Sequence, residues 1–228
     1  MHRFKIVGIG LIIAGFMFAG VGGYTYLRTA EGAKALQAFS AAQNVALTYD
    51  DQGQLVDRGK AEGATAIMSL LTNDWGYRVD PNDLNPNDPV VNTASEYMYQ
   101  MATIAYHTLH STQKVTLTEP AEYNGKTYEP GTYDVAVNGR YWSQFDRLDP
   151  LDGPARELAW TGTAHALIAE LGVGSMTASA LQMGLGIAAI AGALGAILVL
   201  TGIGVIWAVR PQEAVAKATE RVTAPNAI

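Results

Sequence analysis

Two histidines, His107 and His110, have the spacing that most resembles a metal site in this sequence. They lie three positions apart in a segment, about 93–111, whose apolar residues recur with helical periodicity. Side chains three apart are neighbours on a helix, so both imidazoles could bind one metal ion from the polar face. Glu96 lies roughly three turns away, too far to join them. The alternative is that both histidines simply occupy a solvated helix face.

A third ligand would have to come from a different helix. Ferrous iron with open coordination positions is typically held by two histidines and one carboxylate. His165 and Glu170 lie in a second predicted helix, 154–171, and they complete such a site only if the two helices pair. The sequence contains no cysteine and no Gly-x-Ser-x-Gly elbow, so it has neither a thiol nor that serine framework for nucleophilic catalysis. The residues therefore favour a non-catalytic role and predict no cofactor.

An acidic, proline-rich loop at 80–89 partly resembles a calcium-binding loop. Asp83, Asn85 and Asn87 match the first alternating positions of an EF-hand, but Asp88 stands where glycine is needed and Ala94 where the bidentate glutamate is needed. Turn formation and helix capping explain the same residues more simply.

Two long apolar segments predict membrane spans at 6–27 and 176–209. The first is 22 residues without a charge, about 33 Å as a helix, and it matches the roughly 30 Å hydrocarbon layer. The second contains an uncharged stretch, 183–209, that is longer still. A cleavable signal peptide is an alternative for the first segment. Neither span contains Asp, Glu, Lys, Arg or His, which disfavours a transporter or proton channel.

Both spans contain rows of small residues at four-residue spacing. Such a row gives a helix a smooth face and lets another backbone approach closely. We expect these rows to mediate helix packing, either between the two spans or with helices of other proteins. The residues are Gly15, Ala19 and Gly23 in the first span, and Gly184, Ala188, Gly192 and Ala196 in the second.

Charge is distributed unevenly along the chain. The two ends carry five basic and two acidic residues, whereas the segment between Arg28 and Glu170 carries 10 basic and 19 acidic residues. Positive flanks predict that both ends, 1–5 and 210–228, are cytoplasmic and that the segment 28–175 lies outside the cell membrane. The acidic middle also argues against nucleic-acid binding.

The outer segment is predicted to be an α+β domain of amphipathic helices and a small antiparallel β-meander. A helix at 33–44 continues the first span, a short hairpin turns at 51–53, and further helices cover 60–73, 93–111 and 154–171. Alternating patterns predict strands at 115–118, 126–128, 132–137 and 140–145. Asn-Gly pairs at 124–125 and 138–139 favour hairpin turns. Glycines at 172 and 174 are expected to end the last helix before the membrane.

The stretch Arg140-Tyr-Trp-Ser-Gln-Phe-Asp-Arg-Leu-Asp-Pro150, followed by a helix and a Gly/Ala-rich span, resembles a group of small bacterial two-span membrane proteins. Those proteins often carry the label "aromatic ring-opening dioxygenase". The likeness covers the first span and roughly 140–209. It implies a two-span protein with an exported loop, and it does not support the enzymatic label.

Three functions follow as hypotheses. The first is an accessory or assembly subunit of a larger membrane complex, with respiratory assemblies among the candidates, whose partners are other integral membrane subunits and the lipid bilayer. The second is an extracytoplasmic ligand-binding or sensor module. The third is a metal-dependent enzyme that uses His107 and His110.

Overall fold

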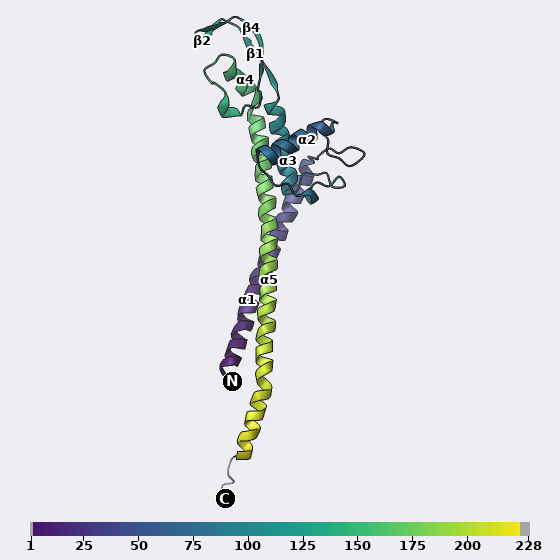
Figure 1. The fold of residues 1–228 in the computed structure, drawn as a ribbon, viewed down its shortest axis with the longest axis vertical. Coiled ribbons are helices and arrows are strands. Elements are labelled where there is room, and N and C mark those ends of the chain that lie inside the picture. The colour runs from purple at the N-terminus through teal and green to yellow at the C-terminus, as the bar shows by residue number, and fades with distance from the viewer. Residues whose placement is uncertain (1, 224–228) are drawn as a thin grey trace. The chain divides into compact units, whose positions relative to one another are not determined.

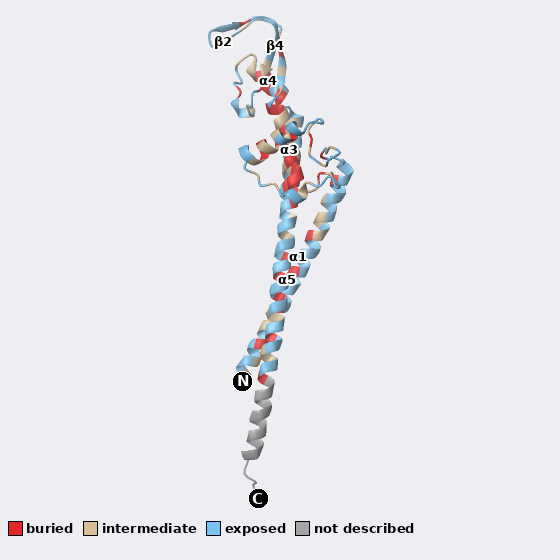
Figure 2. Ribbon diagram, turned by 45° about the vertical axis from the view of Figure 1, so that its right-hand side comes forward, coloured by how far each residue is buried: buried red, intermediate tan, exposed pale blue. Residues whose placement is uncertain are grey.

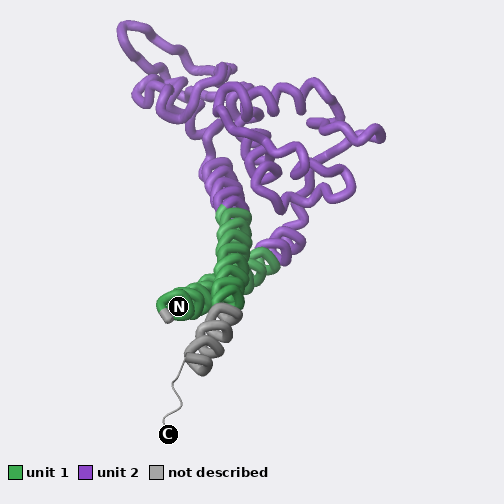
Figure 3. Tube along the Cα trace, turned by 60° about the horizontal axis from the view of Figure 1, so that its bottom comes forward, with its two compact units in different colours: residues 1–35, 180–228 green, residues 36–179 purple. Residues whose placement is uncertain are grey.

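Both apolar segments of the sequence form parts of long helices. In the computed structural model, which describes residues 2–223 and the side chains of 3–209, α1 spans His2–Gln43 and α5 spans Gly162–Thr223. The chain divides into two units, one of residues 1–35 and 180–228 and the other of residues 36–179 (Figure 3). Both helices are long and apolar enough to cross a membrane. The fold is thus mixed, with two candidate membrane helices.

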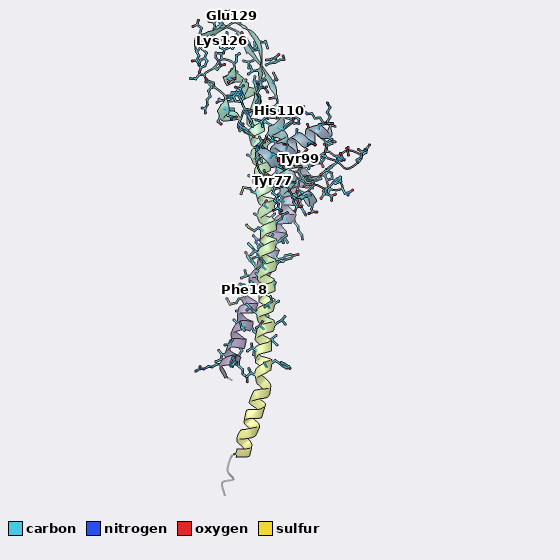
Figure 4. All side chains as sticks on the ribbon, in the orientation of Figure 1. Phe18, Tyr77, Tyr99, His110, Lys126 and Glu129 are labelled. Atoms are coloured by element: carbon cyan, nitrogen blue, oxygen red, sulfur yellow. The ribbon has the colours of Figure 1, made fainter. Side chains whose placement is uncertain are left out.

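The smaller unit consists of the apolar parts of α1 and α5. The two helices lie side by side there (Figure 1). Their large apolar side chains are mostly exposed, including Phe18 (Figure 4), Met17 and Leu200. A helix pair of this kind is therefore held by its small residues rather than by a core of large ones.

The larger unit is organised around α3 (Ala94–Leu109), which is buried along much of its length (Figure 2). Thr93 begins the helix with a capping box, because its hydroxyl accepts from the backbone N–H of Glu96 while the Glu96 carboxylate accepts from that of Thr93. Tyr97, Tyr99 and Ala102 of α3 belong to one apolar cluster with α2 (Ala61–Ser69) and the π-helical turn Leu70–Asp74. The sequence prediction of these two helices is confirmed.

The other half of α3 joins a second apolar cluster beneath a β arm. Ala105 and Leu109 pack there with α4 (Asp152–Ala159), Val115 and Val137. β1 (Thr112–Leu117) pairs antiparallel with β4 (Gly131–Ala136), and β2 (Ala121–Tyr123) pairs with β3 (Lys126–Tyr128). The β2–β3 hairpin, with Lys126, lies at the far end of the arm (Figures 1 and 4).

The predicted antiparallel strands at 115–118, 126–128 and 132–137 are confirmed, but the predicted meander order and the predicted strand at 140–145 are wrong. Asn138 and Gly139 do adopt the positive φ values of 51° and 76° that the Asn-Gly turn requires. However, the Arg140 guanidinium then bonds to the carbonyls of Ala136 and Val137 and to Asp152, and the chain enters a 3-10 turn at Trp142–Gln144. These bonds direct the segment away from the sheet. The four strands themselves form two separate two-stranded ladders, because β2 and β3 pair with each other between β1 and β4.

The expected break at 172–174 is also wrong. The helix predicted at 154–171 instead ends at Trp160, and α5 then runs without interruption through both glycines. A Cβ at Gly174 would lie 2.5 Å from the Tyr97 ring, whereas one at Gly172 would meet only the Met101 sulfur, at 3.8 Å. Gly174 therefore makes room for α3 rather than ending the helix.

Candidate functional site

His107 and His110 lie on α3, and each contacts a different group. The Nε2 atom of His107 is 2.9 Å from a carboxylate oxygen of Asp57, which comes from the loop before α2. The Nδ1 atom of His110 is 2.8 Å from the carbonyl oxygen of Tyr106, and its ring lies 4.1 Å from that of Tyr106 (Figure 4). The two imidazoles are therefore engaged in separate structural contacts.

The further ligands considered for a metal do not join these histidines. His165 lies with its Nδ1 atom 3.1 Å from the carbonyl oxygen of Thr161 and its ring against Trp142. Glu170 lines a cavity that is described below. Among the described side chains, no group of three or more histidines, aspartates and glutamates is placed to hold a metal ion. The three histidines make hydrogen bonds and ring contacts with separate groups.

Glu96 is a buried carboxylate, with 1% of its surface exposed. Desolvation by burial raises the pKa of Glu96, and the negative charge of Asp88 adds to this, while hydrogen bonds from the backbone of Asn92 and Thr93 and from the Thr93 hydroxyl act in the opposite direction. The carboxylate therefore serves to hold the start of α3. The Thr-x-x-Glu spacing of a capping box would have identified it from sequence.

Two tyrosines extend this polar interior. Tyr49 and Tyr99 have hydroxyl groups buried within the larger unit. Burial, followed by the negative charge of Asp57, raises the pKa of Tyr99 (Figure 4), and burial followed by the charge of Glu96 raises that of Tyr49. Both hydroxyls therefore stay neutral at physiological pH, as is typical of tyrosines in a core.

The Asp/Asn-rich loop uses its side chains for local structure. Asp80 accepts hydrogen bonds from the backbone and side chain of Asn82, and Asn85 accepts one from the backbone of Asn87. A carboxylate oxygen of Asp83 lies 3.2 Å from the backbone nitrogen of Ser95, at the start of α3. These bonds are those of turns and caps, as the simpler interpretation of the loop expects.

The Arg140–Pro150 stretch forms a corner beside α4. Arg140 lies with its guanidinium 2.6 Å from Asp152 and over the Phe145 ring, and its carbonyl accepts from the Trp160 indole. The Tyr141 hydroxyl accepts a hydrogen bond from the indole N–H of Trp75. Trp75 itself packs against both apolar clusters. The stretch therefore acts as a structural tie.

The seam between α1 and α5 is built from small residues that recur every seven positions, not every four. A seven-residue repeat is the spacing of left-handed coiled coils. A Cβ at Gly15 would lie 2.7 Å from the Gly195 carbonyl oxygen, and a Cβ at Gly195 would lie 2.7 Å from the Gly15 carbonyl oxygen. The buried positions at this spacing are Gly8, Gly15, Gly22 and Thr29 in α1, and Ala188, Gly195, Gly202 and Val209 in α5, and Ala191 is buried between two of them.

The seam has a fixed antiparallel register. From Gly8 to Gly22, each step of seven residues along α1 is matched by a step of seven back along α5, and the last step, to Thr29, is matched by a step of four, to Gly184. From Gly8 to Thr29 the seam is about 32 Å long at 1.5 Å per residue, close to the thickness of a bilayer's hydrocarbon layer. Close contacts link Gly8 with Gly202, Gly15 with Gly195, Gly22 with Ala188, and Thr29 with Gly184.

Most of the small residues singled out from sequence lie at or beside this seam. Gly15, Gly184 and Ala188 are in direct contact across it. Ala19 and Gly192 contribute backbone nitrogens that lie 2.7 Å and 2.8 Å from the Cβ positions of the glycines opposite.

Gly23 and Ala196 lie away from the seam. Both are exposed, and no described atom outside its own helix lies within 4 Å of a Cβ built at Gly23. Gly10, Gly20 and Gly204 are equally open. The small residues therefore form two sets, one that packs within the chain and one that faces outward.

A cavity of about 550 Å³ lies within the larger unit, between the last turns of α1, the first turns of α5 and the middle of α3. Its lining is mainly apolar, and the hydroxyls of Ser40 and Tyr97 are hydrogen-bonded to each other at 2.7 Å. Sequence analysis missed this cavity because its walls come from three segments far apart in the chain. The lining includes Leu36, Phe39, Val45, Val91, Gln100, Ile104, Leu167, Glu170, Leu171 and Val173.

Comparisons of the chain with protein-family models, with curated proteins and with solved structures find no match. The likeness to two-span bacterial proteins therefore stays a prediction, and the function must be argued from the geometry.

Proposed function

We propose that this chain is a two-span protein of the cell membrane and acts as a non-catalytic accessory subunit of a larger membrane complex. Both termini would lie in the cytoplasm, and the domain between the spans would lie outside. The partners would be other integral membrane subunits, among which respiratory assemblies are candidates.

The division of the small residues into two sets carries this proposal. The inward set is fully engaged by backbone contact between α1 and α5, so the pair needs no other helix to complete it. The outward set, which includes Gly23 and Ala196, gives the pair smooth patches between large exposed side chains. In lipid, such patches are the places at which a foreign helix can approach closely.

The structural contacts of His107, His110 and Glu96 support a non-catalytic role. His107 binds Asp57, His110 binds its own helix, and Glu96 caps α3. Each group thus has a structural task that explains its presence.

Purification of the intact protein from membranes in mild detergent tests the proposal. We expect Gly23→Leu combined with Ala196→Leu to remove co-purifying membrane subunits, because both substitutions fill the open patches without touching the seam. The matched control is Val21→Leu combined with Ile197→Leu, which changes two exposed positions that are already bulky. Equal recovery of partners from both variants would contradict the accessory role.

A further inference from the structure

The cavity in the larger unit is suited to an apolar chain rather than to a polar ligand. The Ser40 hydroxyl donates to the Leu36 carbonyl and is hydrogen-bonded to the Tyr97 hydroxyl. Most of the remaining wall consists of Leu, Ile, Val and Phe side chains, and its other polar residues are Gln43, Gln100, Glu170 and Thr177. Its volume of about 550 Å³ falls within the range of roughly 300–1,000 Å³ that is typical of small-molecule sites.

The cavity is partly open, and several of the large apolar side chains that line it are exposed. Phe39 is 50% exposed, Leu167 40% and Val173 66%, and all three line it. Apolar side chains gathered around an open cavity mark a surface that another apolar group covers. A chain lying in the cavity would cover these side chains together.

Two features indicate which apolar molecule occupies the cavity. Two walls of the cavity are the parts of α1 and α5 that are continuous, in the same helices, with the apolar segments. Glu170 is the charged residue among those that line it, so the carboxylate of a free fatty acid would meet a like charge. We propose that the cavity holds an acyl chain of a bilayer phospholipid. This inference rests on the proposed membrane insertion but not on the accessory role.

Photolabelling of the full chain in phosphatidylcholine nanodiscs tests this site. The probe is a phosphatidylcholine with a diazirine near the end of one acyl chain, and the labelled peptides are mapped by mass spectrometry. We expect label on residues 36–45 and 167–177 in addition to residues 6–27 and 183–209. A free fatty acid with the same diazirine, added at equal concentration, should label 36–45 and 167–177 far less.

Variants that fill the cavity give the decisive comparison. Leu167→Trp at an exposed lining position and Ile104→Trp in the wall should each reduce the cavity label about tenfold and leave the span label unchanged. Leu158→Trp is the matched control, because Leu158 is 49% exposed and does not line the cavity. Leu167→Trp changes an exposed residue, so its folding should survive if Ile104→Trp fails to fold.

Each other outcome overturns a distinct statement. Label confined to 6–27 and 183–209 would exclude the cavity as a lipid site while leaving insertion intact. Label that is absent from the spans as well would contradict membrane insertion itself. Cavity label that persists in Leu167→Trp, or that is stronger with the fatty acid, would overturn the proposed occupant.

Discussion

The two units of the molecule solve the problem of helix packing in opposite ways. Along the seam of α1 and α5, glycines bring one backbone against the other, and the large side chains point outward. Around α3, large side chains such as Ile67, Leu71 and Tyr99 fill the interior. The first arrangement depends on side chains being absent at fixed intervals, and the second depends on their being present. Substitutions that enlarge a side chain should therefore destabilise the helix pair, and substitutions that shorten one should destabilise the larger unit.

The largest effect is expected from truncation in the larger unit. Leu71 is fully buried, so Leu71→Ala should lower the free energy of unfolding of that unit by about 2–5 kcal/mol through lost burial and the cavity left behind. Hydrogen exchange of the purified full chain in detergent would report it as faster exchange in 61–74 and 94–109. Leu148→Ala, at a position that is 79% exposed, is the control and should change little. Equal exchange in the two variants would contradict the assigned core.

Enlargement should harm the seam by a smaller amount. A Cβ at Gly195 would meet the backbone of Gly15 and Ala19 at 2.7 Å, so Gly195→Ala should destabilise the helix pair by about 1–3 kcal/mol. Unfolding of the detergent-solubilised chain by added sodium dodecyl sulfate, followed by energy transfer between labels on α1 and α5, measures this loss.

The control for the seam is Gly204→Ala in the same helix. No described atom outside its helix lies within 4 Å of a Cβ there, and alanine is the better helix former by about 1 kcal/mol, so this variant should be unchanged or more stable. Similar losses in both variants would show that the seven-residue seam does not hold the pair together.

A pair of neighbouring glycines in α5 should distinguish close approach from flexibility. Gly174→Ala would place its Cβ 2.5 Å from the Tyr97 ring and should cost about 1–2 kcal/mol, whereas Gly172→Ala meets only ordinary contact with Met101. Thermal unfolding followed by near-ultraviolet circular dichroism compares the two. A greater loss of stability in Gly172→Ala than in Gly174→Ala would instead support the predicted break in the helix.

The smallest effect concerns the buried Glu96. Burial raises its pKa in the folded chain, so its carboxyl group favours folding below its unfolded value of about 4.5, and this contribution is lost as the pH rises through the folded pKa. Glu96→Gln keeps an acceptor for the capping box but cannot titrate. The stability of the parent chain relative to this variant should therefore fall as the pH rises above about 4.5. A difference that stays constant above that pH would contradict the raised pKa.

The parts of the fold that are encoded locally could be predicted from sequence. The helix at 93–111 and the hairpin at Asn124-Gly125 depend on patterns that act over a few residues, and both formed where they were expected. The Thr93–Glu96 box is equally local and could have been predicted in the same way. The role of Gly174 was predicted wrongly because glycine is needed there to make room for the ring of Tyr97, which lies far away in the sequence. The cavity was missed for the same cause, since its walls meet only in the folded chain.

The glycine pattern was only partly predictable. Gly15 belongs both to a four-residue row with Ala19 and Gly23 and to a seven-residue row with Gly8 and Gly22. A single helix gives no reason to prefer one row. The choice is made by the facing helix, because α5 carries small residues at a matching interval of seven.

The central positions of the seam resemble one another, because small residues recur there every seven residues. Sliding one helix by two turns, about 10 Å, would place Gly15 opposite Gly202 and Gly22 opposite Gly195, but it would place Gly8 opposite Val209. The glycines in the middle of the seam therefore tolerate this shift, and the bulkier residues at its ends, Val209 and Thr29, oppose it. A seven-residue spacing also tolerates a change of length, because a helix that gains or loses seven residues keeps its small residues on the same face.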